Sequence, residues 1–292
     1  MKQRNSTDGN FWIQLALPSQ LFLFLFFLGP LIFILLLSFL HRGTYGGYEW
    51  IFQIENYVRL FSSQSANSIL RSLILALETS AICVPAGFII SWAMMGMSPA
   101  KRLAAIVFIS LPFFSSLIVR VYAIRSFVGI DGPLQRWLHL LGLNIDPFVF
   151  SAHPTLVLCG MILSYLPFAV FPIYSAFEKF DFLLIDAAHD LGANDWEIFK
   201  LILLPGLSKG LTAAFLLVFT PALGEFVIPE LLGGGKVQYF GNLITDTFLK
   251  TRDWPFGAAL SVIFCLILGL VVFAGSQFSQ RKYARGEERN LS

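Results

Sequence analysis

Long apolar stretches alternate with short polar segments over most of the 292 residues of the chain. A hydrocarbon core about 30 Å thick requires a helix of about 20 apolar residues, and six stretches reach that length. They run approximately over residues 13–40, 69–97, 103–127, 155–176, 211–232 and 257–278. The pattern predicts an all-α membrane protein with six transmembrane helices in a single domain, residues 1–292. The first stretch is too long for a secretory signal and is expected to be retained.

Composition and charge fit this interpretation and add an orientation. The chain is 56% hydrophobic and 13% charged, with a mean hydropathy of +0.72, whereas soluble domains have roughly 25% charged residues. Cytoplasmic loops are enriched in Lys and Arg. One set of alternate segments holds most of them: Lys2, Arg4, Lys101, Arg102, Lys179, Lys200, Lys209, Arg281, Lys282, Arg285 and Arg289. Both termini and residues 177–210 are therefore predicted to be cytoplasmic.

The polar segment 177–210 is expected to fold as two short helices. Asp181 can cap a helix over Phe182 to Leu191, and Gly192 supplies a left-handed stop. Asn194 with Glu197 three residues later forms a capping box for a second helix, which Pro205 is predicted to end. Two short helices joined by a small-residue elbow form a rigid projection that a groove in another protein can bind.

The spacing within this segment resembles the cytoplasmic loop of bacterial ABC importer permeases. The resemblance rests on Asp186, Ala187, Ala188, Gly192, Ile202, Leu204 and Pro205. One position departs, because Asp186 stands where that family usually has Glu. The likeness implies a type I ABC importer permease fold in a bacterial plasma membrane, with residues 177–210 as a helical coupling loop that contacts an ATPase. An amphipathic interfacial helix pair without a partner is the alternative.

The sequence offers no catalytic chemistry of its own. It lacks the phosphate-binding pattern Gly-x4-Gly-Lys-Ser/Thr, and Gly233–Lys236 is only a superficial likeness. No metal site, disulfide or nucleophile is suggested by the scattered His41, His139, His153 and His189 or by Cys83, Cys159 and Cys265 within the spans. We therefore expect no enzyme activity and no cofactor in this chain, with ATP and Mg²⁺ bound by a partner subunit. Nucleic acid is not an expected partner.

A substrate path is suggested by ionisable residues inside the spans. Such residues cost about 2.5–3.5 kcal/mol each at the bilayer centre and normally face a bundle interior or water. Glu78 is predicted near mid-membrane in the second span, and Glu225 in a fifth span weakened by two prolines and a glycine. Arg120 could pair with either glutamate or act in transport. Trp92 and Tyr122 could contact an organic cation through their rings, although interfacial anchoring is the alternative for each.

Three further stretches resemble the spermidine/putrescine branch of the permease family: residues 111–122, 223–234 and 252–258. The resemblance implies a second related permease subunit, two nucleotide-binding ATPase subunits and an extracytoplasmic polyamine-binding protein. Neighbouring branches carry iron, thiamine or sulfate. The alternatives from other classes are an ion-coupled secondary carrier, with Glu78 or Glu225 as proton site, and a membrane scaffold without transport activity.

Overall fold

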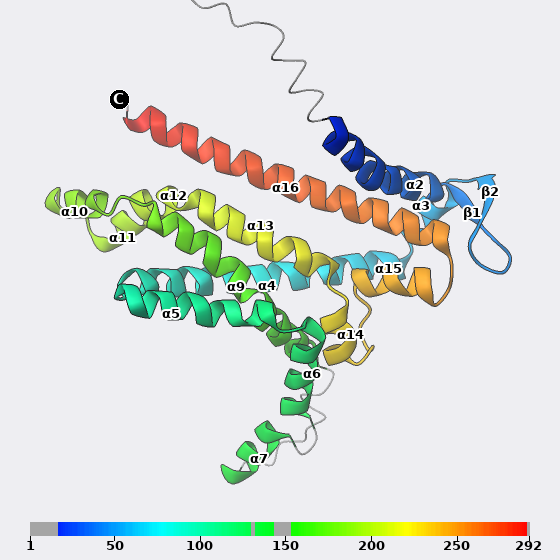
Figure 1. The fold of residues 1–292 in the computed structure, drawn as a ribbon, viewed down its shortest axis with the longest axis horizontal. Coiled ribbons are helices and arrows are strands. Elements are labelled where there is room, and N and C mark those ends of the chain that lie inside the picture. The colour runs from blue at the N-terminus through cyan, green and yellow to red at the C-terminus, as the bar shows by residue number, and fades with distance from the viewer. Residues whose placement is uncertain (1–16, 130–131, 143–152, 291–292) are drawn as a thin grey trace, which may run out of the picture. The chain divides into compact units, whose positions relative to one another are not determined.

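The computed structural model describes residues 17–129, 132–142 and 153–290, which are mostly helical (Figure 1). The elements in order are η1 (Phe24–Leu28), α2 (Gly29–Leu37), β1 (Leu40–Arg42), β2 (Tyr48–Phe52), α3 (Glu55–Arg59), α4 (Ser63–Met95), α5 (Pro99–Ser110), η2 (Leu111–Phe114), α6 (Leu117–Val128), α7 (Pro133–Leu140), α9 (Pro154–Glu178), α10 (Leu183–Asp190), α11 (Asp195–Ile198), η3 (Phe199–Leu203), α12 (Leu204–Gly206), α13 (Ser208–Gly224), α14 (Val227–Gly233), α15 (Phe240–Leu249) and α16 (Trp254–Asn290). Two compact units form, one of residues 1–62 and 244–265 and one of residues 63–243 and 266–292.

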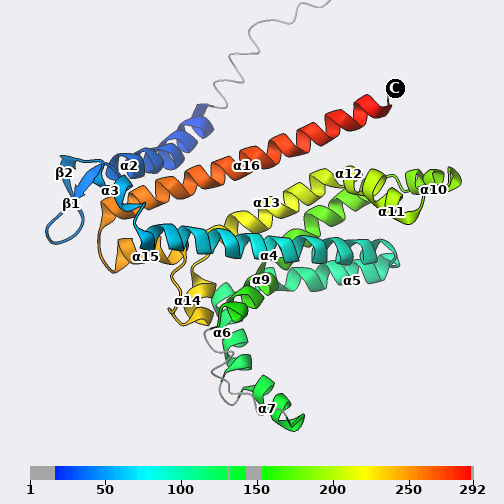
Figure 2. The same cartoon turned by 180° about the vertical axis from the view of Figure 1, so that it is seen from behind.

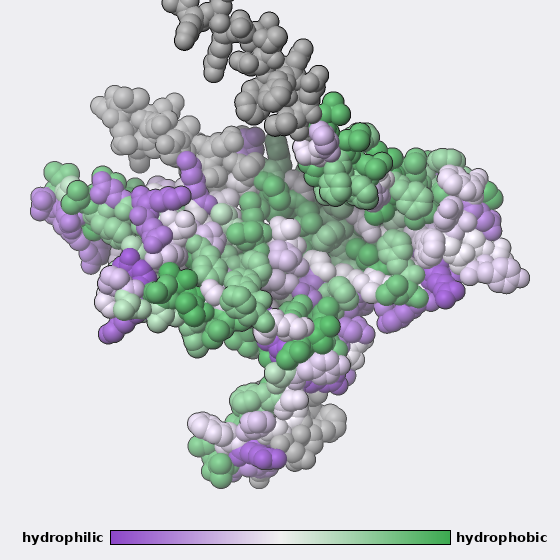
Figure 3. Space-filling view, viewed as in Figure 1, coloured by the Kyte–Doolittle hydropathy of each residue, from purple (hydrophilic) through white to green (hydrophobic). Residues whose placement is uncertain are grey.

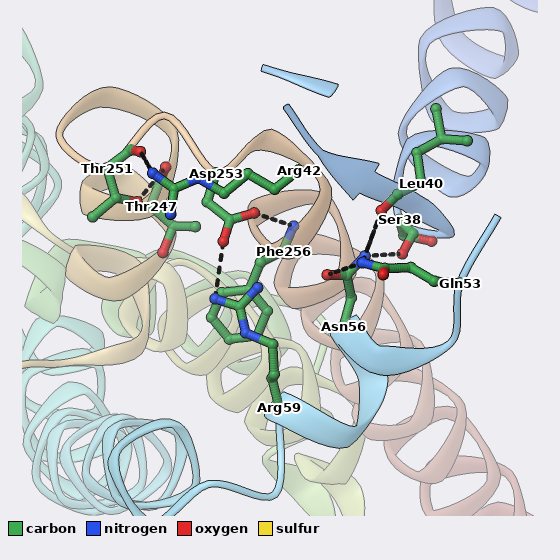
Figure 4. A network of polar contacts seen from close by, with 10 residues as sticks. All are labelled: Ser38, Leu40, Arg42, Gln53, Asn56, Arg59, Thr247, Thr251, Asp253 and Phe256. Carbon is green, nitrogen blue, oxygen red and sulfur yellow. Dashed lines mark hydrogen bonds and ion pairs between the residues drawn. The ribbon is translucent and has the colours of Figure 1, made fainter. Parts of the chain in front are cut away.

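The first unit carries an antiparallel hairpin of β1 and β2, which the sequence pattern did not predict. Two glycines at its turn, Gly46 and Gly47, have φ of +96° and +79°, a conformation that glycine adopts without a side-chain penalty. The buried Asn56 of α3 donates to the carbonyl oxygens of Ser38 and Leu40 at 3.0 and 2.8 Å, which fixes α3 beneath the hairpin (Figure 4).

An ion pair ties α3 to the start of α16 in the same unit. The Arg59 guanidinium lies 2.9 Å from a carboxylate oxygen of Asp253, which is 3% exposed, and stacks 4.1 Å from the ring centre of Phe256 (Figure 4). The other oxygen of Asp253 accepts from the backbone N–H of Phe256 at 3.2 Å. Asp253 therefore caps the helix and neutralises the arginine at once.

The second unit is organised around three helices, α4, α9 and α13, which pack along one another (Figures 1 and 2). Small residues permit the close approach that membrane helices favour. At Gly87 of α4 an added Cβ would lie 3.0 Å from the Cβ of Ala169 in α9. One turn further along α4, the buried Ser91 hydroxyl donates to the carbonyl of Val170 at 3.1 Å. This three-helix packing positions the candidate site residues that α4, α9 and α13 carry.

The predicted number of six spans is confirmed only if each bent pair of helices is counted as one span. Among the described residues, four helices are long and apolar enough to cross a membrane: Leu17–Leu37, Ser63–Met95, Pro154–Glu178 and Trp254–Gly275. Two bent helix pairs raise the number to six: Pro99–Phe114 plus Leu117–Leu140, and Asp195–Gly206 plus Ser208–Gly224. On the face shown, hydrophobic side chains predominate over the helix Leu17–Leu37, whereas polar ones gather over α10 and α11 (Figure 3).

Three predicted boundaries were wrong. The first span ends at Leu37, because Leu40 begins β1; residues 13–16 of that prediction lie outside the described residues. The third is interrupted at Ser115, whose extended backbone with ψ of 141° ends η2 before α6 begins. The fifth is interrupted at Glu225, which separates α13 from α14.

Candidate functional site

The coupling loop, residues 177–210, has the predicted glycine stop and capping box, but α10 begins at Leu183 with Phe182 at its N-cap, one residue after the predicted start. The Asp181 carboxylate accepts from the N–H of Leu183 at 3.0 Å, and Gly192 has φ of +83°. The Asn194 amide oxygen accepts from the N–H of Glu197 at 2.9 Å while the Glu197 carboxylate accepts from the N–H of Asn194 at 3.0 Å. Both reciprocal bonds of the capping box are therefore formed. Local sequence chemistry alone specifies this helix–turn–helix.

A side-chain contact closes the elbow between the two helices. His189 of α10 and Asp195 of α11 lie 3.1 Å apart on either side of Gly192. The residues that carry the family resemblance surround this elbow and the turn that follows it. Ala188 is buried, Ile202 and Leu204 are half-buried, and Asp186, Ala187, Gly192 and Pro205 are exposed. The four exposed residues form a surface that is accessible to another protein.

The second helix ends at Gly206, one residue beyond the predicted end at Pro205, and a 66° bend separates Asp195–Gly206 from Ser208–Gly224. The π turn η3 precedes the proline, with the N–H of Leu204 donating to the carbonyl of Phe199 five residues earlier. Pro205 thus begins a new turn, where its missing N–H is not needed, instead of interrupting an established one.

A cavity of about 450 Å³ separates α4 from the coupling loop. It is lined by Phe88, Ile89, Trp92, Ile185, His189, Asp195, Ile198, Phe199 and Leu203. The Trp92 ring, predicted in the substrate path, stacks 6.4 Å from that of Phe88 and meets Phe177 edge-on at 5.6 Å. The structure therefore places Trp92 at the coupling-loop end of α4, about 21 Å along the helix axis from Glu78.

Glu225 sits at the joint between α13 and α14 and is 9% exposed. One carboxylate oxygen accepts from the backbone N–H groups of Phe226, Val227 and Ile228, at 3.1, 2.9 and 3.3 Å. The other accepts from the hydroxyl of Tyr165 in α9. Because a carboxylate at the start of a helix satisfies its free N–H groups and its dipole, Glu225 has the bonding of a structural cap.

Glu78 is placed quite differently. It is exposed on α4 and forms no hydrogen bond or ion pair with another described residue. It belongs to a stripe that the rest of the unit leaves uncovered, which we call the uncovered face of α4: residues 67, 70, 71, 74, 77, 78, 81, 82, 85, 89, 92 and 93. An unpaired carboxylate midway along such a helix needs water, a ligand or a partner chain.

The basic and aromatic candidates of the third span lie at its interruption. Among the described residues Arg120 forms no ion pair with Glu78 or Glu225. Its guanidinium instead donates to the carbonyl of Pro112 and to the hydroxyl and carbonyl of Ser115, the last two at 3.2 and 3.4 Å. It thereby satisfies backbone groups that the break in the helix exposes. Tyr122 is exposed on α6, two residues further on.

Two further residues of this region bear on Glu225 and Glu78. The sequence suggests the ring of Tyr165 as a cation contact near a carboxylate or as an interfacial anchor, but not that its hydroxyl donates to Glu225. Arg71, not considered at all, shares the uncovered face of α4 with Glu78. Seven residues are almost two full helical turns, so the spacing of Arg71 and Glu78 could have placed both charges on one face. No sequence signal connects Tyr165 with Glu225, which lie 60 positions apart.

Comparison with known proteins assigns a family to this arrangement. Residues 84–285 match the family described as binding-protein-dependent transport system inner membrane component. The spermidine/putrescine transport system permease protein PotB of Haemophilus influenzae is 36% identical over 251 residues, covering 86% of this chain and 88% of the relative. The protein of the same name from Escherichia coli K12 is 34% identical over 250 residues, covering 86% and 91%.

Solved structures share the fold at lower identity. A bacterial ABC transporter involved in import of the acidic polysaccharide alginate aligns with a TM-score of 0.78 at 18% identity, covering 94% of this chain and 96% of that one. An inward-facing MetNI methionine ABC transporter aligns with a TM-score of 0.55 at 14% identity, covering 78% and 97%. The type I ABC permease fold is thus confirmed, and the chain belongs to the family of binding-protein-dependent inner membrane transport components.

Proposed function

We propose that this chain is a permease subunit of an ATP-driven importer that moves polyamines inward across the bacterial inner membrane by alternating access. The coupling loop carries this proposal, because its capped helices and exposed elbow form a rigid surface at one end of α9 and α13. Relatives named as spermidine/putrescine permeases, at 34–36% identity over 86% of the chain, supply the substrate class.

The path residues agree with a cationic substrate, but unequally. Glu78 is exposed and has no partner in the part of the chain that the structure describes, so its charge is available to an ammonium group. The charge of Glu225 is already compensated by three N–H groups and one hydroxyl. We therefore assign cation attraction to Glu78 and a structural role to Glu225. The two glutamates thus have different roles, although the sequence analysis placed both in the substrate path.

The proposal includes partners that complete the transporter. Separate nucleotide-binding subunits hold ATP and Mg²⁺ and grip the coupling loop. A second, related permease lies against the uncovered face of α4, so that Glu78 faces a path between two chains. An extracytoplasmic binding protein delivers the polyamine. Both termini and the coupling loop lie in the cytoplasm, in keeping with the distribution of Lys and Arg.

Energy transfer follows from linkage between the states of this assembly. ATP shifts the equilibrium between inward and outward access only because the ATPase dimer binds the coupling loops differently in the two states. Closure of that dimer draws the loops together and moves the helices attached to them. Polyamine released at Glu78 in the inward-facing state then leaves to the cytoplasm.

Reconstitution tests the proposal. The chain is inserted into vesicles with its ATPase, second permease and binding protein, and uptake of labelled spermidine, putrescine, iron, thiamine and sulfate is measured with and without ATP. ATP-dependent uptake of the two polyamines alone is expected. Uptake by the isolated chain driven by an ion gradient would establish a secondary carrier instead, and preference for another solute would reject the polyamine assignment.

A further inference from the structure

Two opposite charges share the uncovered face of α4. Arg71 and Glu78 are both exposed, and neither has a hydrogen-bond or ion-pair partner among the described residues. Seven residues separate them, so the Cα atoms differ by about 10.5 Å along the helix axis. Arg71 lies nearer the Ser63 end, the end opposite the coupling loop. A solute approaching Glu78 from that end passes Arg71 first.

The segment after α14 holds this half of α4 in place. Gln64 donates to Gln238 at 3.1 Å, and the N–H of Phe240 donates to the hydroxyl of Ser72 at 2.7 Å. Tyr239 between them is 5% exposed. Burial raises the pKa of Tyr239, the positive charge of Arg71 lowers it, and the negative charge of Glu78 raises it. Both charges therefore act on the same buried ring, which lies beside this part of the uncovered face.

We propose that Arg71 is a specificity-determining residue that disfavours long polyamines relative to short ones at Glu78. The inference rests on the proposed function, since it takes Glu78 to be the carboxylate that receives an ammonium group. Arg71 contributes a fixed positive charge about two helical turns outside that carboxylate. Any second positive charge of the solute that stops beside Arg71 is repelled.

Chain length decides which solute meets this repulsion. Spermidine has nine bonds between its terminal nitrogens, as many as three residues of extended backbone, so it spans about 10–11 Å. Its trailing ammonium is still level with Arg71 when the leading one reaches Glu78. Putrescine has five such bonds and spans about 6 Å. Its trailing ammonium has by then moved inward of the arginine.

Coulomb's law gives the size of the effect. Like charges about 4 Å apart in water repel enough to weaken binding roughly fivefold, and the repulsion energy halves at twice the distance and grows at lower dielectric constant. Neutralising Arg71 should therefore lower the KM for spermidine about two- to tenfold more than the KM for putrescine. A charge-retaining lysine should leave the ratio of the two KM values near that of the unaltered protein.

The experiment measures concentration-dependent uptake of both polyamines by the reconstituted complex carrying Arg71→Gln or Arg71→Lys. Arg125→Gln is the matched control, because it removes an exposed arginine from another span, α6. A selective fall of the spermidine KM in Arg71→Gln alone supports the proposal. An unchanged ratio, an equal fall for both amines, or the same change in Arg125→Gln overturns it.

The design separates this inference from the proposed function. If the unaltered complex takes up neither polyamine, the proposed function fails. If it takes up both and the Arg71→Gln ratio is unchanged, only the role of Arg71 fails.

Discussion

Removing the Glu225 carboxylate is expected to destabilise the joint between α13 and α14. Glu225→Ala leaves three backbone N–H groups and the Tyr165 hydroxyl without their acceptor. An unsatisfied buried polar group costs about 1–3 kcal/mol. Water can reach some of these groups once the side chain is gone, so the sum is reduced. We expect a loss of about 3–5 kcal/mol in the free energy of unfolding.

Glu225→Gln separates the charge from the hydrogen bonds. The glutamine oxygen can still accept from the backbone, while its NH₂ group can turn to the Tyr165 oxygen. What is lost is the charge at the helix start and the added strength of charge-assisted bonds, together about 1–2 kcal/mol. Glu78→Gln should change stability by less than about 0.5 kcal/mol, as surface substitutions generally do.

The assay compares, for the same three variants, the fraction of complex that stays assembled after heating and the uptake of polyamine at low concentration. Glu225→Ala should lose assembly, Glu225→Gln should lose part of it, and Glu78→Gln should assemble normally but take up less polyamine. Equal stability of Glu225→Ala and the unaltered protein would refute the structural role. Normal uptake by Glu78→Gln would refute the assignment of cation attraction to that carboxylate.

Three other substitutions test separate parts of the structure. Gly192→Val should cost about 1–3 kcal/mol because φ is +83°, although no atom obstructs a Cβ there, and loss of ATPase co-purification would show it, with Gly192→Ala giving a smaller loss. Asp253→Asn keeps the helix cap but removes the counter-charge of Arg59, which is 42% exposed, so the free energy of unfolding should fall by about 1–3 kcal/mol and the complex should dissociate at a lower temperature; unchanged stability would contradict the stabilising role of the Arg59–Asp253 ion pair. Arg102→Ala removes donors to the carbonyls of Met94 and Met95 at the end of α4 and should lower membrane yield more than Arg102→Lys does.

The coupling loop was predictable because its structure is local. Asn194 and Glu197 are three residues apart, and Gly192 needs only its own backbone freedom, so short-range capping chemistry specifies the helix ends. The π turn before Pro205 was not predictable, because it depends on how η3 leads into α13, which no single residue encodes.

The positions at which the spans are interrupted could be predicted only in part from the sequence. Gly224 and the prolines around it signalled the break at Glu225, but the pair Ser115 and Ser116 is unremarkable by hydropathy. The hairpin was missed because its three- and five-residue strands are too short for a periodicity count. Its register depends on Asn56, which reaches back across 16 and 18 positions. Such contacts are set by tertiary packing and not by local preference.

Glu78 and Glu225 illustrate why function is harder to predict than fold. Both are carboxylates in apolar stretches, and an insertion cost applies equally to each. The two carboxylates differ in the hydrogen-bond donors around them. The break between α13 and α14 offers three backbone N–H groups to Glu225, whereas the unbroken helix α4 offers none to Glu78. Only the backbone path through Glu225 reveals that its charge is already used.

The uncovered face of α4 connects the coupling loop to the proposed substrate site in one element. Trp92, which lines the cavity against the coupling loop, and Glu78 lie on the same helix, about 21 Å apart along its axis. Pro85 lies between them, but helix assignment continues from Ser63 to Met95. A helix is stiff over this length, so displacement at the Trp92 end is accompanied by displacement of Glu78. Because the cavity between α4 and the coupling loop is lined mainly by apolar side chains from both, movement of the loop changes the packing against Phe88 and Trp92. The same helix that bears the proposed cation site thus offers a direct mechanical route from the proposed ATPase-binding surface to the proposed path.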